Sequence, residues 1–253
     1  GARCLGLASE FKRPDDLRRL VQRLETLGPT ARLYAARFLN EHADPDAARA
    51  LAETALKSGD ARAVGRLALE LALAQPVDQP WLDLADRSLS HALAADPDDV
   101  DLLWSMSLVR HTQRRYDDEV ALYKAMIAAK PKHLDFLNNL AWTLSEGLRR
   151  PAEALVYADQ AVAALGRRPG LLDTRGTILL RLGRIDEAVR DLEEAARGAP
   201  SASVWFHLAR AYQAAQRHNE FHAARDRALH AGLSEDSLEP GDRAAWDSVM
   251  KAP

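Results

Sequence analysis

Residues 171–200 read LLDTRGTILLRLGRIDEAVRDLEEAARGAP, which is the pattern of two amphipathic helices joined by a short turn. On each side of Leu182-Gly183, apolar residues recur every three or four positions, as they do on one face of an α-helix. Small residues, which let two helices cross closely, stand at Gly176, Ala188 and Ala195. Pro200 follows the second helix and ends it. The sequence therefore predicts an antiparallel helical hairpin.

The same pattern recurs along the chain with a period of about 34 residues. Pro97 and Pro131 are 34 residues apart, and Pro200 follows 69 residues later, close to two periods. Ala154 and Ala188 are also 34 residues apart. Two further series mark the first helix of each unit: an apolar residue at Leu103, Leu137, Leu172 and Trp205, and a small residue at Ser107, Ala141, Gly176 and Ala209. A repeat of this length predicts a stack of hairpins.

These units resemble the tetratricopeptide repeat (TPR) family. In the clearest unit, Leu172 stands at the family's Trp or Leu position, Leu179 at its Tyr position and Pro200 at its terminating proline. Residues 138–212 resemble the TPR regions of large bacterial multidomain proteins, in particular those of planctomycetes. The resemblance implies an all-α fold: a right-handed α-solenoid of antiparallel helix hairpins (a TPR superhelix) with a C-terminal capping helix.

We expect a single TPR solenoid over residues 1–253, with residues 1–99 as divergent N-terminal hairpins, 100–233 as clear TPR hairpins, and 234–253 as a capping helix and tail. The divergent part is expected to be helical over 15–28, 30–42, 44–56, 60–74 and 81–97. Two units depart from the pattern. The unit that starts at residue 100 has Glu119 and Met126 where small residues are usual, and the unit that starts at residue 136 carries one extra residue.

Composition narrows the class of protein. The chain has 253 residues, 47% of them hydrophobic and 28% charged, as expected of a folded, soluble chain. No apolar run is long enough to span a membrane. The formal net charge of -3 disfavours a nucleic-acid binder, because such proteins neutralise phosphates with a basic excess. Gly1 in place of Met suggests that the sequence starts inside a longer protein, so it leaves a targeting segment undecided; the compartment stays open between the cytoplasm, which is slightly favoured, and the periplasm.

Histidine and cysteine residues form no recognisable chemical site. His218 and His222 share a helix face at a spacing that zinc can use, but no third ligand is evident apart from Asp226 or His230. We expect two solvated histidines there. The single Cys4 has no His or Asn partner in a recognisable motif, so a nucleophile is not expected.

Charged residues also lack a catalytic pattern. Arg167 and Arg168 form a basic turn, but the strand–loop–helix context of a phosphate loop is missing. Paired carboxylates such as Asp117-Asp118 fall near helix starts, where they favour the helix dipole. We therefore expect no catalytic residue, no metal and no cofactor, and we predict that the protein is not an enzyme.

The resemblance further implies that the first helix of each hairpin lines a concave groove that meets a partner. Carried onto this sequence, the partner-binding positions are Trp104, Asn138, Trp142, Asp173, Thr177, Arg181, Phe206 and Arg210. Within each hairpin they follow helical spacing and so share one face. Aromatic and Arg side chains are the usual anchors of interfaces. The alternative for Trp104 and Trp142 is packing in the core between helices.

The predicted function is that of a protein–protein interaction scaffold, which binds a partner protein or peptide along its concave groove and acts as one arm of a larger protein. The first alternative is a structural module that self-associates into a homo-oligomer. Enzyme activity is a distant third. The sequence itself does not identify the partner.

Overall fold

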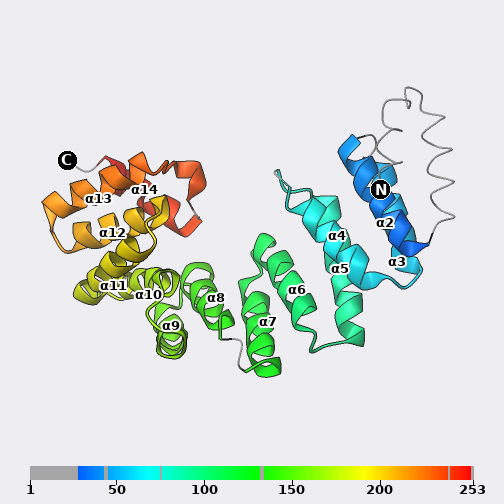
Figure 1. Ribbon diagram of the computed structural model, residues 1–253, viewed down its shortest axis with the longest axis horizontal. Helices are drawn as coiled ribbons and strands as arrows, with labels where there is room; N and C mark the ends of the chain where they lie inside the picture. The colour runs from blue at the N-terminus through cyan, green and yellow to red at the C-terminus, as the bar shows by residue number, and fades with distance from the viewer. Residues whose placement is uncertain (1–27, 43–44, 75, 132–133, 239, 252–253) are drawn as a thin grey trace. The chain divides into compact units, whose positions relative to one another are not determined.

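The computed structural model describes residues 28–42, 45–74, 76–131, 134–238 and 240–251, and within these ranges every regular element is helical (Figure 1). None of the helices described there has the length and apolarity needed to cross a lipid bilayer. Contacts between residues divide the chain into two compact units, unit 1 (1–113) and unit 2 (114–253). The expectation of one continuous solenoid over 1–253 stays a prediction.

The residues of unit 1 that the structure describes form two helical hairpins and one further helix. The helices are α2 (Pro29–His42), α3 (Pro45–Lys57), α4 (Ala61–Ala72), α5 (Gln79–Ala95) and α6 (Val100–Thr112). Helix α2 packs against α3, and α4 packs against α5. Aspartates start three of these helices: the carboxylates of Asp60, Asp78 and Asp99 each accept a hydrogen bond from the backbone N–H three residues on. The helix expected over residues 15–28 lies almost wholly outside the described residues.

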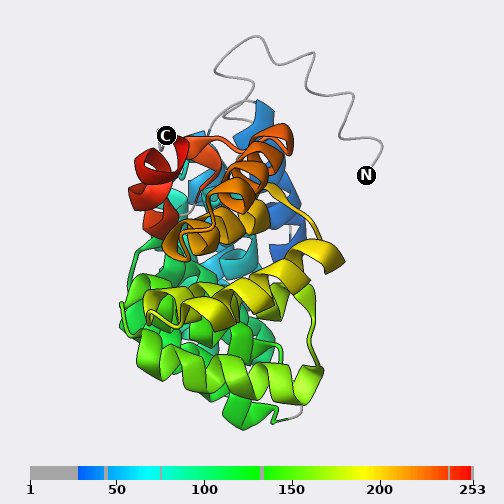
Figure 2. The same ribbon diagram turned by 90° about the vertical axis from the view of Figure 1, so that its left-hand side faces the viewer.

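Unit 2 continues the pattern of hairpins and ends in a single helix (Figure 2). Its elements are α7 (Tyr116–Ala129), α8 (Phe136–Trp142), the π-helical turn η1 (Thr143–Gly147), α9 (Pro151–Leu165), α10 (Pro169–Arg181), α11 (Ile185–Gly198), α12 (Ala202–Ala214), α13 (His218–His230), the 3₁₀ turn η2 (Glu235–Ser237) and α14 (Pro240–Met250). Three successive hairpins follow, as the repeat predicts. Their first helices are α8 continued by η1, then α10, and then α12. The all-α solenoid of TPR-type hairpins is confirmed.

Small residues hold the two helices of each hairpin together. The predicted small positions of the second helices are completely buried, at Ala154, Ala161, Ala188 and Ala195. A β-carbon added to Gly176 of α10 would lie 2.6 Å from Leu192 Cγ and 3.4 Å from the Ala188 carbonyl oxygen of α11. This confirms that Gly176 lies at the crossing with α11, although Leu192 is the side chain nearest to it.

The turn between the helices of a hairpin is also repeated. In unit 2, the second residue after the first helix of each of the three hairpins has a left-handed backbone, with φ of 56° at Arg149, 74° at Gly183 and 57° at Gln216. A left-handed residue there ends an α-helix by giving its last carbonyl groups hydrogen-bond partners. The predicted turn at Leu182-Gly183 is therefore confirmed.

The extra residue of the hairpin that starts at residue 136 is taken up by η1. The small residues of its two helices, Ala141 and Ala154, are 13 positions apart in the sequence. The equivalent residues of the next hairpin, Gly176 and Ala188, are 12 positions apart. In η1 the Leu148 N–H donates to the Thr143 carbonyl five residues back, at 3.1 Å, which is the π-helical bond. The π turn absorbs one residue without breaking the hairpin.

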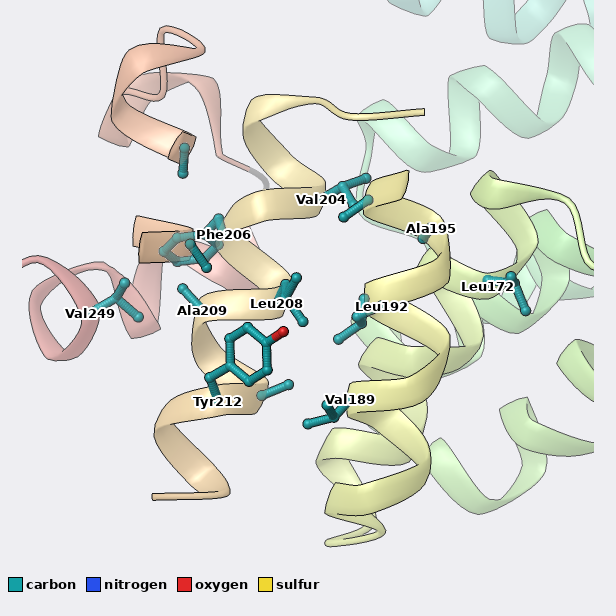
Figure 3. Close-up of a cluster of buried hydrophobic side chains, with 14 of the residues drawn as sticks. Leu172, Val189, Leu192, Ala195, Val204, Phe206, Leu208, Ala209, Tyr212 and Val249 are labelled. Atoms are coloured by element: carbon teal, nitrogen blue, oxygen red, sulfur yellow. The ribbon is translucent and has the colours of Figure 1, made fainter. Parts of the chain in front are cut away.

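A band of buried apolar side chains joins the last hairpins to α14 (Figure 3). Val204 and Leu208 of α12 point toward Leu192 of α11. Phe206 lies on the opposite side of α12, which is also the side of Val249 from α14. Complete burial of side chains of this size stabilises a fold by about 1.5–3 kcal/mol each, so this band fixes α12 between its two neighbours.

We predict that Gly176→Leu lowers the unfolding free energy by about 1–3 kcal/mol, because the added side chain would have to displace Leu192 at a close helix crossing. Urea unfolding of the full chain measures this change. The control is Gly170→Ala in the same helix, where an added β-carbon meets nothing within 4 Å. Equal unfolding midpoints for Gly176→Leu and the parent would contradict the assigned crossing.

Candidate functional site

The predicted groove residues fall in both units. Trp104 lies on α6 of unit 1 and is 37% exposed, so it is a surface residue and not a core residue. Asn138 and Trp142 lie one turn apart on α8 of unit 2, and both are half-buried. Trp104 belongs to unit 1, whereas the other predicted groove residues belong to unit 2, where the site is described.

The structure contradicts the prediction that Phe206 is a partner-binding residue of the groove. Its side chain has no exposed surface, so it cannot meet a partner. The physical reason is the position of α14: Val249 lies on the same side of α12 as Phe206 and is itself completely buried (Figure 3). The Arg210 guanidinium also lies over the Phe206 ring, 5.8 Å from its centroid. Phe206 is therefore part of the core that joins α12 to its neighbours.

The predicted residues of α10 lie on one face but differ in how they are bonded. The Thr177 hydroxyl donates to backbone carbonyls of its own helix, the nearer at 2.8 Å on Thr174. Arg181 donates from Nε to Glu146 Oε1 of η1 at 2.8 Å, and its Nη2 donates to the other carboxylate oxygen. A bidentate ion pair of this kind fixes both side chains, so it ties α10 to the preceding hairpin.

His207 joins two carboxylates from different helices. Its Nδ1 lies 2.8 Å from Asp173 Oδ1 on α10, and its Nε2 lies 2.9 Å from Asp242 Oδ2 on α14. Burial alone would lower the pKa of His207, but the charges and hydrogen bonds of Asp173 and Asp242 raise it from 6.5 to about 10. The imidazole is therefore positively charged at neutral pH, with both nitrogens donating.

Asp242 is the point at which α14 is fixed to α12. Besides His207, its carboxylate accepts from Arg210 Nη1. Burial would raise the pKa of Asp242, but the hydrogen bond and charge of His207, with the charges of Arg210 and Arg181, hold it below its ordinary value. We expected Arg210 to meet a partner, whereas in this structure it binds the Asp242 carboxylate of the chain itself.

These contacts define the first-helix face of unit 2, a single surface made by side chains of η1, α10 and α12. Its charged members are Glu146, Asp173, Arg181, His207 and Arg210. The structure thus brings together Asp173, Arg181 and Arg210 from the predicted set and adds Glu146 and His207, together with Asp242, which the sequence reasoning missed.

A signal that could have found the missed residues is the sequence separation of opposite charges. Asp173 and His207 are 34 residues apart, His207 and Asp242 are 35 apart, and so are Glu146 and Arg181. Other ion pairs follow the same rule, among them Arg37–Glu70, Arg87–Glu53 and Arg150–Asp117. Residues one repeat apart lie side by side on successive hairpins, so opposite charges at that separation predict contacts.

Asn138 has an unsatisfied acceptor. Its Oδ1 is shielded from solvent and has no hydrogen-bond partner among the residues that the structure describes. A buried acceptor without a donor costs roughly 1–3 kcal/mol. Asn138 lies on α8, one turn before Trp142. The unsatisfied acceptor is therefore in the part of the predicted groove that is nearest to η1.

The basic turn at Arg167 and Arg168 is occupied by carboxylates of the chain. Arg167 pairs with Glu194 and Asp191, and Arg168 Nη1 lies 3.7 Å from Asp135 Oδ1. Beside this turn is a cavity of about 240 Å³, lined by Asp159, Arg167, Arg175, Leu179, Arg184, Glu187, Arg190 and Asp191. Its acidic and basic groups largely neutralise one another. Over the described ranges, no three His, Cys, Asp or Glu residues gather as a metal site.

We predict that the stabilising effect of His207 depends on pH. The folded chain holds the proton of His207 up to a pKa of about 10, whereas an unfolded histidine loses it near 6.5. The contribution is therefore complete below pH 6.5 and is lost as the pH rises toward 10. The excess stability of the parent over His207→Gln should shrink by at least about 1 kcal/mol between pH 6 and pH 9.5.

Guanidinium unfolding of both proteins at the two pH values measures this difference. An excess that stays constant over the range would show that His207 does not carry a charge in the folded chain.

Comparison with known proteins supports the fold. No family model matches the chain. A curated relative, a TPR repeat-containing protein of Pseudomonas aeruginosa, is 27% identical over 122 residues, which are 48% of this chain and 21% of the relative. The chain thus spans about a fifth of the length of this relative.

Solved structures of TPR proteins superpose on most of the chain. PilW, a widely conserved type IV pilus biogenesis factor, has a TM-score of 0.57 at 20% identity, over 68% of this chain and 80% of PilW. A thermophilic TPR protein of Thermus thermophilus has 0.56 at 20%, over 74% and 99%. YrrB, described as a TPR protein with an unusual peptide-binding site, has 0.53 at 18%, over 72% and 92%. With its repeat of about 34 residues and these structural neighbours, the chain has the fold of tetratricopeptide repeat proteins.

Proposed function

We propose that the chain is an interaction scaffold that binds a segment of a partner protein on the first-helix face of unit 2. The observation that carries this proposal is the continuity of the face. Glu146 reaches Arg181 across the first pair of hairpins, and Asp173 reaches His207 across the second. Three successive first helices therefore offer one surface to an extended or helical segment, and not three separate patches.

The chemistry of the face suits a peptide. Trp142 offers a broad apolar side chain, and Asn138 one turn away has an acceptor in need of a donor, such as a partner's backbone N–H. Reaching that oxygen would require a rotation of the Asn138 amide, since it is shielded in the unbound chain. Arginine and tryptophan supply most of the binding energy in typical interfaces, and this face has both.

Other functions have less support. The arginines of the face are held in ion pairs, and the formal net charge is -3, so we propose neither nucleic-acid binding nor membrane insertion. No residue of the face is assigned a catalytic role, and we propose a non-enzymatic protein without a cofactor. By analogy of fold, the peptide-binding site ascribed to YrrB agrees with this reading.

The proposal can be tested by placing a photo-crosslinking residue at Thr177, as Thr177→p-benzoylphenylalanine, in the source cell. We expect this variant to capture a partner covalently, because Thr177 lies in the middle of the face. The matched control carries the same residue at Val156, which is exposed on the second helix α9. Capture at Val156 and not at Thr177 would contradict the proposal.

We predict that Trp142→Ala weakens binding of the captured partner at least about tenfold and leaves the helical content unchanged. Calorimetry with the purified partner measures the affinity. Val156→Ala is the control, since it also truncates an apolar side chain but outside the face. Glu193 and Glu194 are unsuitable controls, because Glu193 accepts from Tyr212 and Glu194 pairs with Arg167. Should light scattering instead show that Trp142→Ala dissociates an oligomer of the parent, self-association would replace partner binding.

A further inference from the structure

A helix of this chain already lies on part of the first-helix face. Helix α14 packs against α12 (Figure 1). Its first turn meets side chains from three hairpins. Asp242 contacts His207 and Arg210 of α12. A β-carbon added to Gly241 would lie 3.3 Å from Arg181 Nη2 of α10 and against the Glu146 carboxylate of η1. The start of α14 thus lies where those side chains converge. We call this position, between Glu146, Arg181, His207 and Arg210, the seat of α14.

The contacts of α14 follow a simple pattern. Asp242 lies in the first turn, Ala245 and Trp246 follow three and four residues later and pack against the core, and Val249 follows after seven and is completely buried. These positions share one side of a helix. Gln213 of α12 also donates from Nε2 to the Ser248 carbonyl at 2.8 Å, so the two helices run side by side in the same direction.

The charge of the face determines what can occupy this place. Without α14, Arg210 loses Asp242, the carboxylate with which it pairs, and His207 keeps only its contact with Asp173. The Arg210 side chain is only 16% exposed. A largely buried guanidinium without a partner is strongly unfavourable. Whatever replaces α14 therefore has to bring one carboxylate to the position of Asp242.

Because its connection to α13 is short, α14 competes with any partner that binds at the same position. Helix α13 ends at His230 and α14 begins at Pro240, so residues 231–239 tether α14 beside its seat. A short tether holds a segment at an effective concentration of the order of millimolar. A partner that uses the same seat has to displace α14, and its apparent affinity falls by the fraction of chains in which the seat is open.

We propose that the seat of α14 is the binding site for a partner helix of the same design: a carboxylate in the first turn, followed by apolar side chains after three or four and after seven residues. Helix α14 is the resident ligand that keeps this site closed. The inference rests on the proposed function, since it names the chemistry of the partner and the element that regulates its access.

The test uses the full chain and a fluorescent synthetic peptide of residues 240–251, PGDRAAWDSVMK, as a stand-in for the partner helix. Asp242→Asn in the chain removes the charge that holds α14 and should open the seat. We expect the peptide to bind Asp242→Asn at least about tenfold more tightly than the parent, as measured by fluorescence anisotropy. A peptide with Asn in place of its own Asp242 should bind this variant at least about tenfold more weakly.

The control variant is Asp247→Asn, because Asp247 lies on the same helix but is exposed and pairs only with Lys251. It should bind the peptide no better than the parent. Equal binding by the parent and Asp242→Asn, or no preference for the peptide with Asp, would overturn the proposal. A dimer of Asp242→Asn in light scattering would also overturn it, since the occupant would then be α14 of a second copy.

Hydrogen exchange of the unaltered chain decides the question if Asp242→Asn does not fold. We expect the amides of residues 245–250 to exchange through an opening that leaves residues 204–212 of α12 protected, because a displaceable helix must leave before the hairpin unfolds. Simultaneous exchange of both segments would make α14 a permanent part of the core.

Peptide binding without any crosslink at Thr177 would refute the proposed function alone, and a crosslinked partner without peptide binding would refute only the chemistry inferred here.

Discussion

The close crossing of the two helices in each hairpin is the constraint on which the rest of the structure depends. At Gly176 there is no room for a β-carbon beside Leu192, and the alanines at the small-residue positions of α9 and α11 have no exposed surface. Because each crossing is tight, each hairpin is a nearly rigid unit, and its first helix is held at a fixed distance from the next. Side chains one repeat apart in sequence then become neighbours in space.

This neighbour relation explains why polar contacts accumulate on the first helices. Glu146–Arg181 and Asp173–His207 each join successive hairpins. Such pairs are partly withdrawn from water, so they have to be satisfied by one another. Asp242 of α14 completes the series by contacting His207 and Arg210, so α14 is joined to the stack by polar contacts as well as by apolar packing.

Much of the fold could be predicted from the sequence, because small residues, turns and prolines report on local packing. The hairpin crossing at Gly176 and the turn at Gly183 are examples. The site was harder to predict, because its geometry depends on α14. Phe206 has the spacing of a groove residue, but α14 and Arg210 close that side of α12. The partnership of His207 with Asp242 is visible in sequence only when opposite charges are compared one repeat apart.

If α14 is the resident ligand that we propose, partner binding depends on the balance between α14 and the partner, and Asp242 sets that balance. The most direct test is a double-mutant cycle on the unfolding free energy with His207→Gln and Asp242→Asn. If the carboxylate anchors α14 through His207, the two changes should be coupled by about 0.5–3 kcal/mol. Additive effects would mean that Asp242 does not hold α14 through His207, which would contradict the account.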